Sequence, residues 1–321
     1  MWSEELKLPS QPGPVQWRHF IDHYVMAPWQ AEGDNLIRAL VRPDDDPVVT
    51  VSRNVGSVEA PDLRVLVYAD SDLPETAVEW VVDALGEALG LMDDVTEFYD
   101  VIVPADRVLA AAAAHGLRGA RLRTSPDVFE AVVAAVASQN VHFSRTYQVM
   151  DRLTRRFGRP VPYPGGIAHT FPSVEAIAQS TEEDLRSSGL GYRAPVLQAL
   201  AGNILGEGVD LQRLRHDPDT GYIRDALMEL PGVGPFTADL VLSIGFRRAS
   251  FHLDSYTKTI LEVLYGVEPD ETKMKAFVDK QFGRWKHYAM LLLTTDTDRW
   301  APSLGIDFPI KSGASYRTPT G

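Results

Sequence analysis

The most constraining feature of this 321-residue chain is the stretch Leu-Pro-Gly-Val-Gly-Pro-Phe-Thr-Ala-Asp at residues 230–239. Gly232 and Gly234 bracket one apolar residue, so the turn can adopt backbone angles that a side chain would forbid. Pro235 follows, and proline suits the first turn of a helix. The pattern predicts a short helix over 222–229, a tight turn and a second helix. The amide groups that begin the second helix would face outward, where a phosphate binds well.

This stretch, together with Asp254 downstream, resembles the helix-hairpin-helix DNA glycosylase superfamily. The resemblance implies that Asp254 is the catalytic aspartate. It also implies that the loop and the start of the second helix bind one DNA phosphate, at Gly232, Val233, Gly234 and Thr237. The residues alone leave simpler alternatives open. Glycine-rich turns are common, and Asp254 is a preferred N-cap for a helix that begins at Ser255.

Two positions carry the chemistry that the resemblance implies. Cleavage of an N-glycosidic bond builds positive charge on the sugar, which a fixed carboxylate such as Asp254 stabilises while it orients or deprotonates water. Glycosylases that also nick the strand have a lysine at the hairpin position of Phe236, where it forms a Schiff base. Lys258 does not match that position, so the resemblance implies a monofunctional enzyme.

The base pocket is the next implication of the resemblance. Phe236 matches an aromatic residue that stacks on the extruded base in alkyl-base glycosylases, with core packing as the alternative. By a looser alignment, Asp296 would complete the pocket after the closing helix. Large aromatics before the first strand, at Trp17, Phe20, Tyr24 and Trp29, are expected to pack in the core. Whether any of them lines the pocket is left open.

A second region extends the resemblance. The helix after Asp127 is apolar nearly all round, which predicts a central, buried element, and it ends in a Ser-Gln-Asn turn. In similar enzymes the residue matching Asn140 fills the gap left by the flipped nucleotide, and Gln139 would lie beside it in the groove. An ordinary helix-ending turn is the alternative. Arg193, in a Gly-Tyr-Arg-Ala segment, is expected either to reach a phosphate or to cover the surface.

Charge and composition limit the possibilities further. The net charge is −13, yet residues 32–106 have a net charge of −14 and residues 118–160 a net charge of +5. DNA could therefore face the middle and C-terminal parts, although solvated surfaces would show the same runs. Cysteine is absent, which excludes disulfides, thiolate zinc sites and iron–sulfur clusters held by cysteine. No apolar run of about 18 residues and no signal peptide is present, so we expect a cytoplasmic protein if the source is prokaryotic.

The fold class that the sequence predicts is α+β. Strands over 35–41, 47–52 and 63–68, followed by a helix over 74–89, indicate an antiparallel sheet. We expect three parts: an N-terminal sheet domain at 1–115, an all-α helix-hairpin-helix domain at 116–310 and a flexible tail at 311–321.

The function predicted is a monofunctional DNA N-glycosylase of the 3-methyladenine glycosylase II type, which removes alkylated purines. A glycosylase for oxidised or deaminated bases and a non-catalytic helix-hairpin-helix DNA-binding protein are the alternatives. The expected partner is double-stranded DNA, with no membrane, and the expected state is a monomer. The resemblance also implies a Na⁺ or K⁺ at the backbone carbonyls of Met228, Leu230 and Val233, and we expect no other cofactor.

Overall fold

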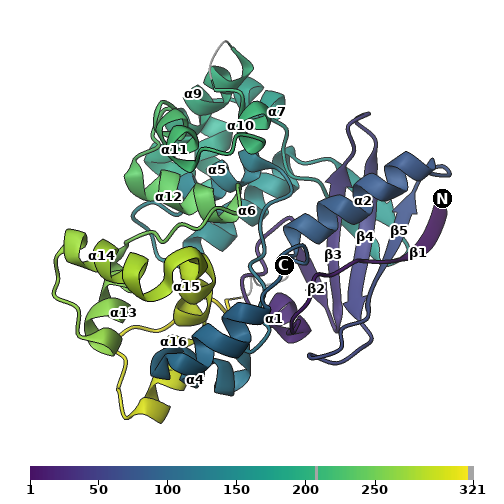
Figure 1. The fold of residues 1–321 in the computed structure, drawn as a ribbon. Helices are drawn as coiled ribbons and strands as arrows, with labels where there is room; N and C mark the ends of the chain where they lie inside the picture. The colour runs from purple at the N-terminus through teal and green to yellow at the C-terminus, as the bar shows by residue number, and fades with distance from the viewer. Residues whose placement is uncertain (207–208, 317–321) are drawn as a thin grey trace.

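A five-stranded antiparallel sheet stands beside a larger helical body in the computed structural model, which describes residues 1–206 and 209–316 (Figure 1). The strand order is β1-β5-β4-β3-β2. The strands are β1 (Trp2–Lys7), β2 (Gln30–Glu32), β3 (Asn35–Val41), β4 (Pro47–Asn54) and β5 (Leu63–Ala69). The sequence predicted the three inner strands, but not the two edge strands, of which β1 has four exposed residues among its six.

Both faces of the sheet are covered. Helix α2 (Glu75–Ala88) crosses one face, where alternate residues of β5 are buried (Figure 1). A second hairpin, β6 (Pro160–Tyr163) with β7 (Gly166–His169), packs on the other face. This hairpin lies in a Pro/Gly-rich stretch, residues 160–172, which was not among the predicted strands. Strand β6 contains two prolines, which are rare in strands. Its Val161 and Tyr163 are nevertheless buried against the sheet.

The first helical cluster surrounds α5 (Val128–Ala137), in which every residue except Ala134 is buried. The prediction of a central helix is therefore confirmed. The side chain of Asp127 caps this helix by accepting the Phe129 amide at 3.0 Å. The other helices of this cluster and its neighbourhood are α6 (Phe143–Phe157), α7 (Val174–Gln179), α8 (Glu182–Leu185), α9 (Ala194–Leu205), α10 (Leu211–Arg215), α11 (Thr220–Met228) and α12 (Pro235–Ile244).

The second helical cluster joins distant parts of the chain. Residues 95–122 share their core with residues 251–308, so α4 lies beside α16 (Figure 1). Its helices are α3 (Val103–Ala105), α4 (Arg107–Ala112), α13 (Ser255–Tyr265), α14 (Glu271–Phe282), α15 (Lys286–Thr294) and α16 (Thr297–Trp300). Short π-helical and 3-10-helical turns complete the chain, at Phe98–Ile102, Ala113–Leu117, Arg186–Leu190, Gly191–Arg193, Gly283–Trp285 and Ala301–Leu304. None of the described helices is long and apolar enough for a membrane span.

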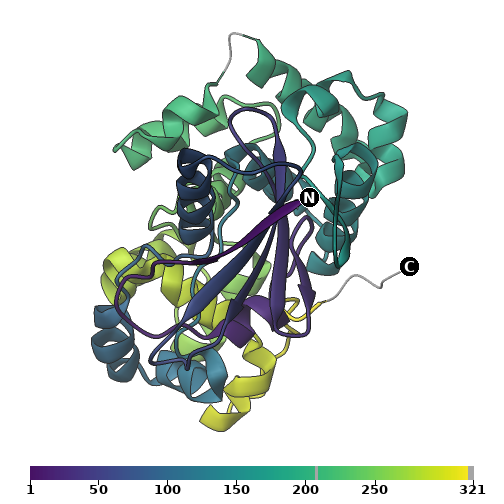
Figure 2. The ribbon, with the colours of Figure 1, turned by 90° about the vertical axis from the view of Figure 1, so that its right-hand side faces the viewer.

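The C-terminal segment returns to α1 (Trp17–Asp22), between the sheet and the helices (Figures 1 and 2). The carbonyl of Ala314 accepts the Tyr24 amide at 2.7 Å and the Tyr147 hydroxyl at 3.3 Å. The prediction of a flexible tail from residue 311 is therefore wrong for residues 311–316. Small residues let this segment lie against α6, since a Cβ at Gly313 would lie 2.9 Å from Phe143. Residues 317–321 lie outside the described part.

Candidate active site

The predicted hairpin is formed by α11 and α12. Gly232 has a φ of +76°, and a Cβ there would collide with Val196 on α9, so both the turn and the close approach of α9 require glycine. Nothing lies within 4 Å of a Cβ added at Gly234. The first-turn amides of Phe236 and Thr237 have no partner within the helix, as at every helix start. They begin a ten-residue helix whose dipole favours an anion at this end.

The carbonyl groups expected to hold a cation lie in the same turn. The Leu230 carbonyl accepts the Val233 amide at 3.1 Å. A carbonyl oxygen has two lone pairs, so this bond leaves Leu230 able to bind an ion. The donor set of Met228, Leu230 and Val233 is all oxygen, which suits Na⁺ or K⁺, and the cation stays a prediction. In the part of the chain that the structure describes, no group of three or more His, Asp or Glu is placed to hold a metal.

Asp254 is the N-cap of α13, as the sequence allowed. Its Oδ1 accepts the Thr257 amide at 2.7 Å and the Thr257 hydroxyl at 2.9 Å, and its own amide donates to that hydroxyl at 2.8 Å. This capping box fixes the carboxylate. Its Oδ2 takes no hydrogen bond from any described residue. One oxygen therefore positions the group while the other stays available for chemistry.

A cavity of about 390 Å³ opens beside Asp254, within the size range of small-molecule sites. Four segments that are far apart in the sequence form its wall. They contribute, respectively, His19 to Trp29, Leu122 to Met150, Phe236 to Thr257 and Met290 to Ala314. Phe236 and Asp254 thus share one cavity, as predicted for a stacking residue and a catalytic carboxylate. The Phe236 ring meets the His252 ring edge-on at 5.3 Å, and burial lowers the pKa of His252.

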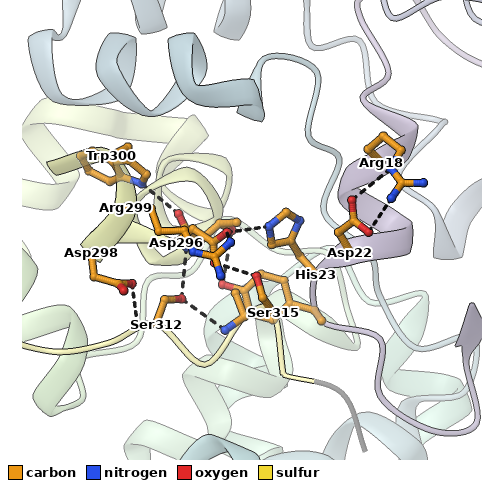
Figure 3. A network of polar contacts seen from close by, with 12 residues as sticks. Arg18, Asp22, His23, Asp296, Asp298, Arg299, Trp300, Ser312 and Ser315 are labelled. Carbon is orange, nitrogen blue, oxygen red and sulfur yellow. Dashed lines mark hydrogen bonds and ion pairs between the residues drawn. The ribbon is translucent and has the colours of Figure 1, made fainter. Parts of the chain in front are cut away.

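Asp296 is not one of the residues that line the cavity, and Figure 3 shows its polar contacts. Its carboxylate is 3.0 Å from His23 Nε2 and accepts the Ser315 hydroxyl at 2.8 Å. Arg299 adds an ion pair at 3.0 Å. Burial raises the pKa of Asp296, but the hydrogen bonds from His23 and Ser315 outweigh burial and hold the pKa below its usual range. Asp296 therefore acts on the cavity through His23, which does line it.

The Ser-Gln-Asn turn sits against the hairpin. The Gln139 side chain donates to the Gly232 carbonyl and to the Thr237 hydroxyl, both at 2.8 Å. Asn140 is exposed at the tip with a φ of 52°, and its amide lies 3.5 Å from the hydroxyl of Tyr192. Tyr192 is 60% exposed, and the sequence analysis did not select it. The Ser-Gln-Asn turn is therefore bonded directly to the hairpin.

Arg193 does not take the predicted role. Its side chain is buried, and Nη1 donates to the Ala137 carbonyl at 3.0 Å and to the Gln139 carbonyl at 2.7 Å. These carbonyls end α5, where the last carbonyls of a helix need outside donors. Arg193 thus stabilises the Ser-Gln-Asn turn by hydrogen bonds to its backbone. Because its side chain is buried, it does not reach a phosphate at the surface.

The arginine excess at 118–160 is also mostly structural. Arg121 is fully buried and donates to backbone carbonyls, among them that of Pro14 at 3.0 Å. Arg118 pairs with Glu59 and Asp100. Arg123 donates to the carbonyls of residues 20, 23 and 24 and lines the cavity. The charge run therefore joins the N-terminal part to the helices, which charge counting cannot distinguish from a DNA-binding surface.

Lysines are scarce around the cavity. Lys258 points away from it and pairs with Glu271 at 2.6 Å. Among the described residues that line the cavity, Lys311 is the only lysine.

Several wall residues were not selected from the sequence. Tyr24, Phe20 and Trp29 line the cavity, while Trp17 does not, which settles the question left open. His19 and His23 also line it. The one sequence signal for this pair is their spacing of one helical turn.

The hairpin, the capped aspartate and the cavity between them define the class: a DNA glycosylase of base excision repair. Residues 133–283 match the HhH-GPD superfamily base excision DNA repair protein family. Over these residues the chain is similar to HhH-GPD superfamily proteins, and its N-terminal antiparallel sheet and helical domain give it the fold of the similar solved structures.

Similar proteins differ in their chemistry. A probable N-glycosylase/DNA lyase of Methanothermobacter thermautotrophicus is 29% identical over 287 residues, 83% of this chain and 87% of the relative. The structure of a 3-methyladenine DNA glycosylase from Archaeoglobus fulgidus aligns with a TM-score of 0.75 and 23% identity, covering 91% of this chain and 97% of that one. The Clostridium acetobutylicum 8-oxoguanine glycosylase/lyase, in complex with double-stranded DNA containing cytosine opposite 8-oxoG, gives 0.64 and 20%, covering 85% and 97%. The similar proteins therefore do not determine which lesion this chain removes or whether it cleaves the DNA strand.

Proposed function

We propose that this protein is a monofunctional DNA N-glycosylase that flips a damaged purine out of duplex DNA and hydrolyses its N-glycosidic bond. The observation that carries the proposal is the cavity whose wall includes both Phe236 and Asp254. Only one oxygen of the Asp254 carboxylate, Oδ1, is used in the helix cap. A base that remains stacked in the duplex cannot reach such a cavity. The hairpin would hold a phosphate while the exposed turn at Asn140 fills the gap.

The proposed reaction follows from how Asp254 is held. As the bond from C1′ to the base nitrogen breaks, the base leaves with the electron pair and the sugar becomes cationic. The carboxylate, fixed through Oδ1, stabilises this charge without reorganising. A water oxygen then bonds to C1′, and its proton passes to the carboxylate. An abasic site remains, and the strand is intact.

Among the described residues, no lysine stands at the hairpin position, which supports water as the attacking group. Phe236 occupies that position, and Lys258 pairs with Glu271. Lys311 lines the cavity from the C-terminal segment, where its side chain is exposed.

Alkylated purines are the first candidate substrate. An N-alkylated purine is electron-poor, so it stacks favourably on an aromatic ring such as Phe236. It is also a good leaving group that needs no acid, and Asp254 alone is then sufficient. Oxidised or deaminated purines are the second candidate. They are favoured by buried polar atoms in the cavity wall that lack hydrogen-bond partners within the described residues.

The test uses duplex oligonucleotides that each carry one lesion: an alkylated purine, hypoxanthine, 8-oxoguanine or uracil. Products are compared with and without hot alkali, and with borohydride present to trap a Schiff base. Cleavage only after alkali, without a trapped complex, is the expected result. A trapped complex that Lys311→Ala abolishes and Lys258→Ala retains would refute the monofunctional proposal. Lesion-independent binding without base release would instead indicate a non-catalytic DNA-binding protein.

A further inference from the structure

Buried polar atoms without partners gather around the cavity. His19, His23, Thr146 and His252 each line it, and each has at least one such side-chain atom in the described structure. A buried donor or acceptor normally has a hydrogen-bond partner, because leaving it unpaired destabilises the fold. A group of them around one cavity is therefore the feature expected of a site for a polar ligand.

Of these four residues, His19 has the most unpaired polar atoms. It lies on α1, is 3% exposed, and neither of its ring nitrogens has a partner. Burial holds its pKa well below the usual range, and the nearby His23 and Arg123 lower it further, while Asp296 raises it. The ring is therefore neutral near pH 7. A neutral imidazole has one nitrogen that donates and one that accepts a hydrogen bond.

His23 extends the same polar wall. Its ring stacks on that of His19 at 5.2 Å, with 22° between the planes. Its Nε2 faces the Asp296 carboxylate, which is an acceptor, so Nε2 carries the proton (Figure 3). Its Nδ1 has no partner among the described residues. The wall thus presents the donor and the acceptor of His19, with His23 Nδ1 beside them.

We propose that His19 is the specificity residue that hydrogen-bonds the edge of the flipped base. Its ring donates one hydrogen bond and accepts another, and the unpartnered Nδ1 of His23 lies beside it as a second polar contact. The ligand class is a purine whose edge carries an N–H group next to an acceptor, as hypoxanthine does with N1–H and O6. This proposal rests on the proposed function, because it requires a base in the cavity.

The test compares His19→Phe, which keeps an aromatic ring, and His19→Gln, which keeps a donor and an acceptor. His287→Phe is the matched control, since His287 also has a buried Nδ1 without a partner but does not line the cavity. Single-turnover excision is measured at pH 7.5 on the lesion that the wild type prefers. His19→Phe is expected to lower the rate about tenfold or more, with partial recovery in His19→Gln and no change in the control. A wild-type rate in His19→Phe would overturn the proposal.

A binding measurement separates recognition from a purely structural role. Asp254→Asn protein, with and without His19→Phe, is titrated with duplexes that differ at one base, hypoxanthine or unsubstituted purine. Tighter binding of hypoxanthine that His19→Phe removes supports the proposal. Equal binding of both bases, or a preference that His19→Phe leaves intact, overturns it. If the wild type excises no lesion, the proposed function fails, and this measurement still decides the role of His19.

Discussion

Asp254 has one role in helix capping and another in the proposed reaction, and a single substitution separates the two roles. Its Oδ1 caps α13 through Thr257 at 2.7 Å, and in the proposed reaction its charge stabilises the cationic sugar. Asparagine keeps an oxygen at the same position and is as good an N-cap as aspartate, so Asp254→Asn should retain the capping bond. Asp254→Ala removes both the cap and the charge.

The expected magnitudes differ accordingly. Loss of the cap in Asp254→Ala should cost about 1 kcal/mol of the free energy of unfolding. Asp254→Asn should change that free energy by no more than a few tenths, roughly 0.3 kcal/mol. Removal of a preorganised charge-stabilising group lowers reaction rates about 10²–10³-fold, and both variants should lose at least this much excision rate.

The assay is single-turnover excision at saturating enzyme, quantified after hot alkali, beside urea unfolding of the same preparations. The reasoning requires that activity falls in both variants and stability only in Asp254→Ala. Full excision by Asp254→Asn would refute a catalytic role for the carboxylate. Equal destabilisation of both variants would instead show that the loss of activity reflects folding.

Three further predictions concern residues outside the reaction centre. Burial lowers the pKa of His287 to about 4, against about 6.5 in an unfolded chain. The unfolded state then binds more protons between these values, so stability should fall as pH decreases from about 6.5 to 4, and His287→Phe should flatten that slope in urea unfolding. Gly232→Ala should cost roughly 1–3 kcal/mol, because of its φ of +76° and the contact with Val196, and should weaken DNA binding; an unchanged melting temperature would contradict this. Arg193→Ala should cost about 1–3 kcal/mol by leaving the Gln139 carbonyl unpaired, while the salt dependence of DNA affinity stays constant; a slope lower by about one would restore Arg193 as a phosphate ligand.

The hairpin and the cap of Asp254 were predictable because local chemistry determines them. Gly232 needs a left-handed conformation, Pro235 begins a helix, and Asp254 bonds a residue three positions later. The same holds for the inner strands, because β-branched residues are frequent in β4 and β5. The edge strand β1 and the hairpin β6–β7 were missed, because pairing and packing against the sheet stabilise them, and their own residues carry weak signals.

The cavity could be predicted only in part, for a related reason. Phe236 and Asp254 follow from a motif, whereas His19, Arg123 and Lys311 reach the wall from separate regions of the fold. Arg193 shows the converse case, since a surface arginine and a buried one that supports helix-ending carbonyls look identical in a sequence. Tertiary contacts, which no local sequence pattern encodes, determine which residues line the cavity and where the Arg193 side chain lies.

The C-terminal segment has a consequence for the selectivity of the protein. Residues 310–314 close part of the cavity, and Ala314 is bonded to Tyr24 near the other end of the chain. A chain that ends before residue 310 still contains the hairpin and Asp254 but lacks this part of the cavity wall. Under the proposed function, we expect a truncation after residue 309 to keep DNA binding and to lose selectivity for the lesion.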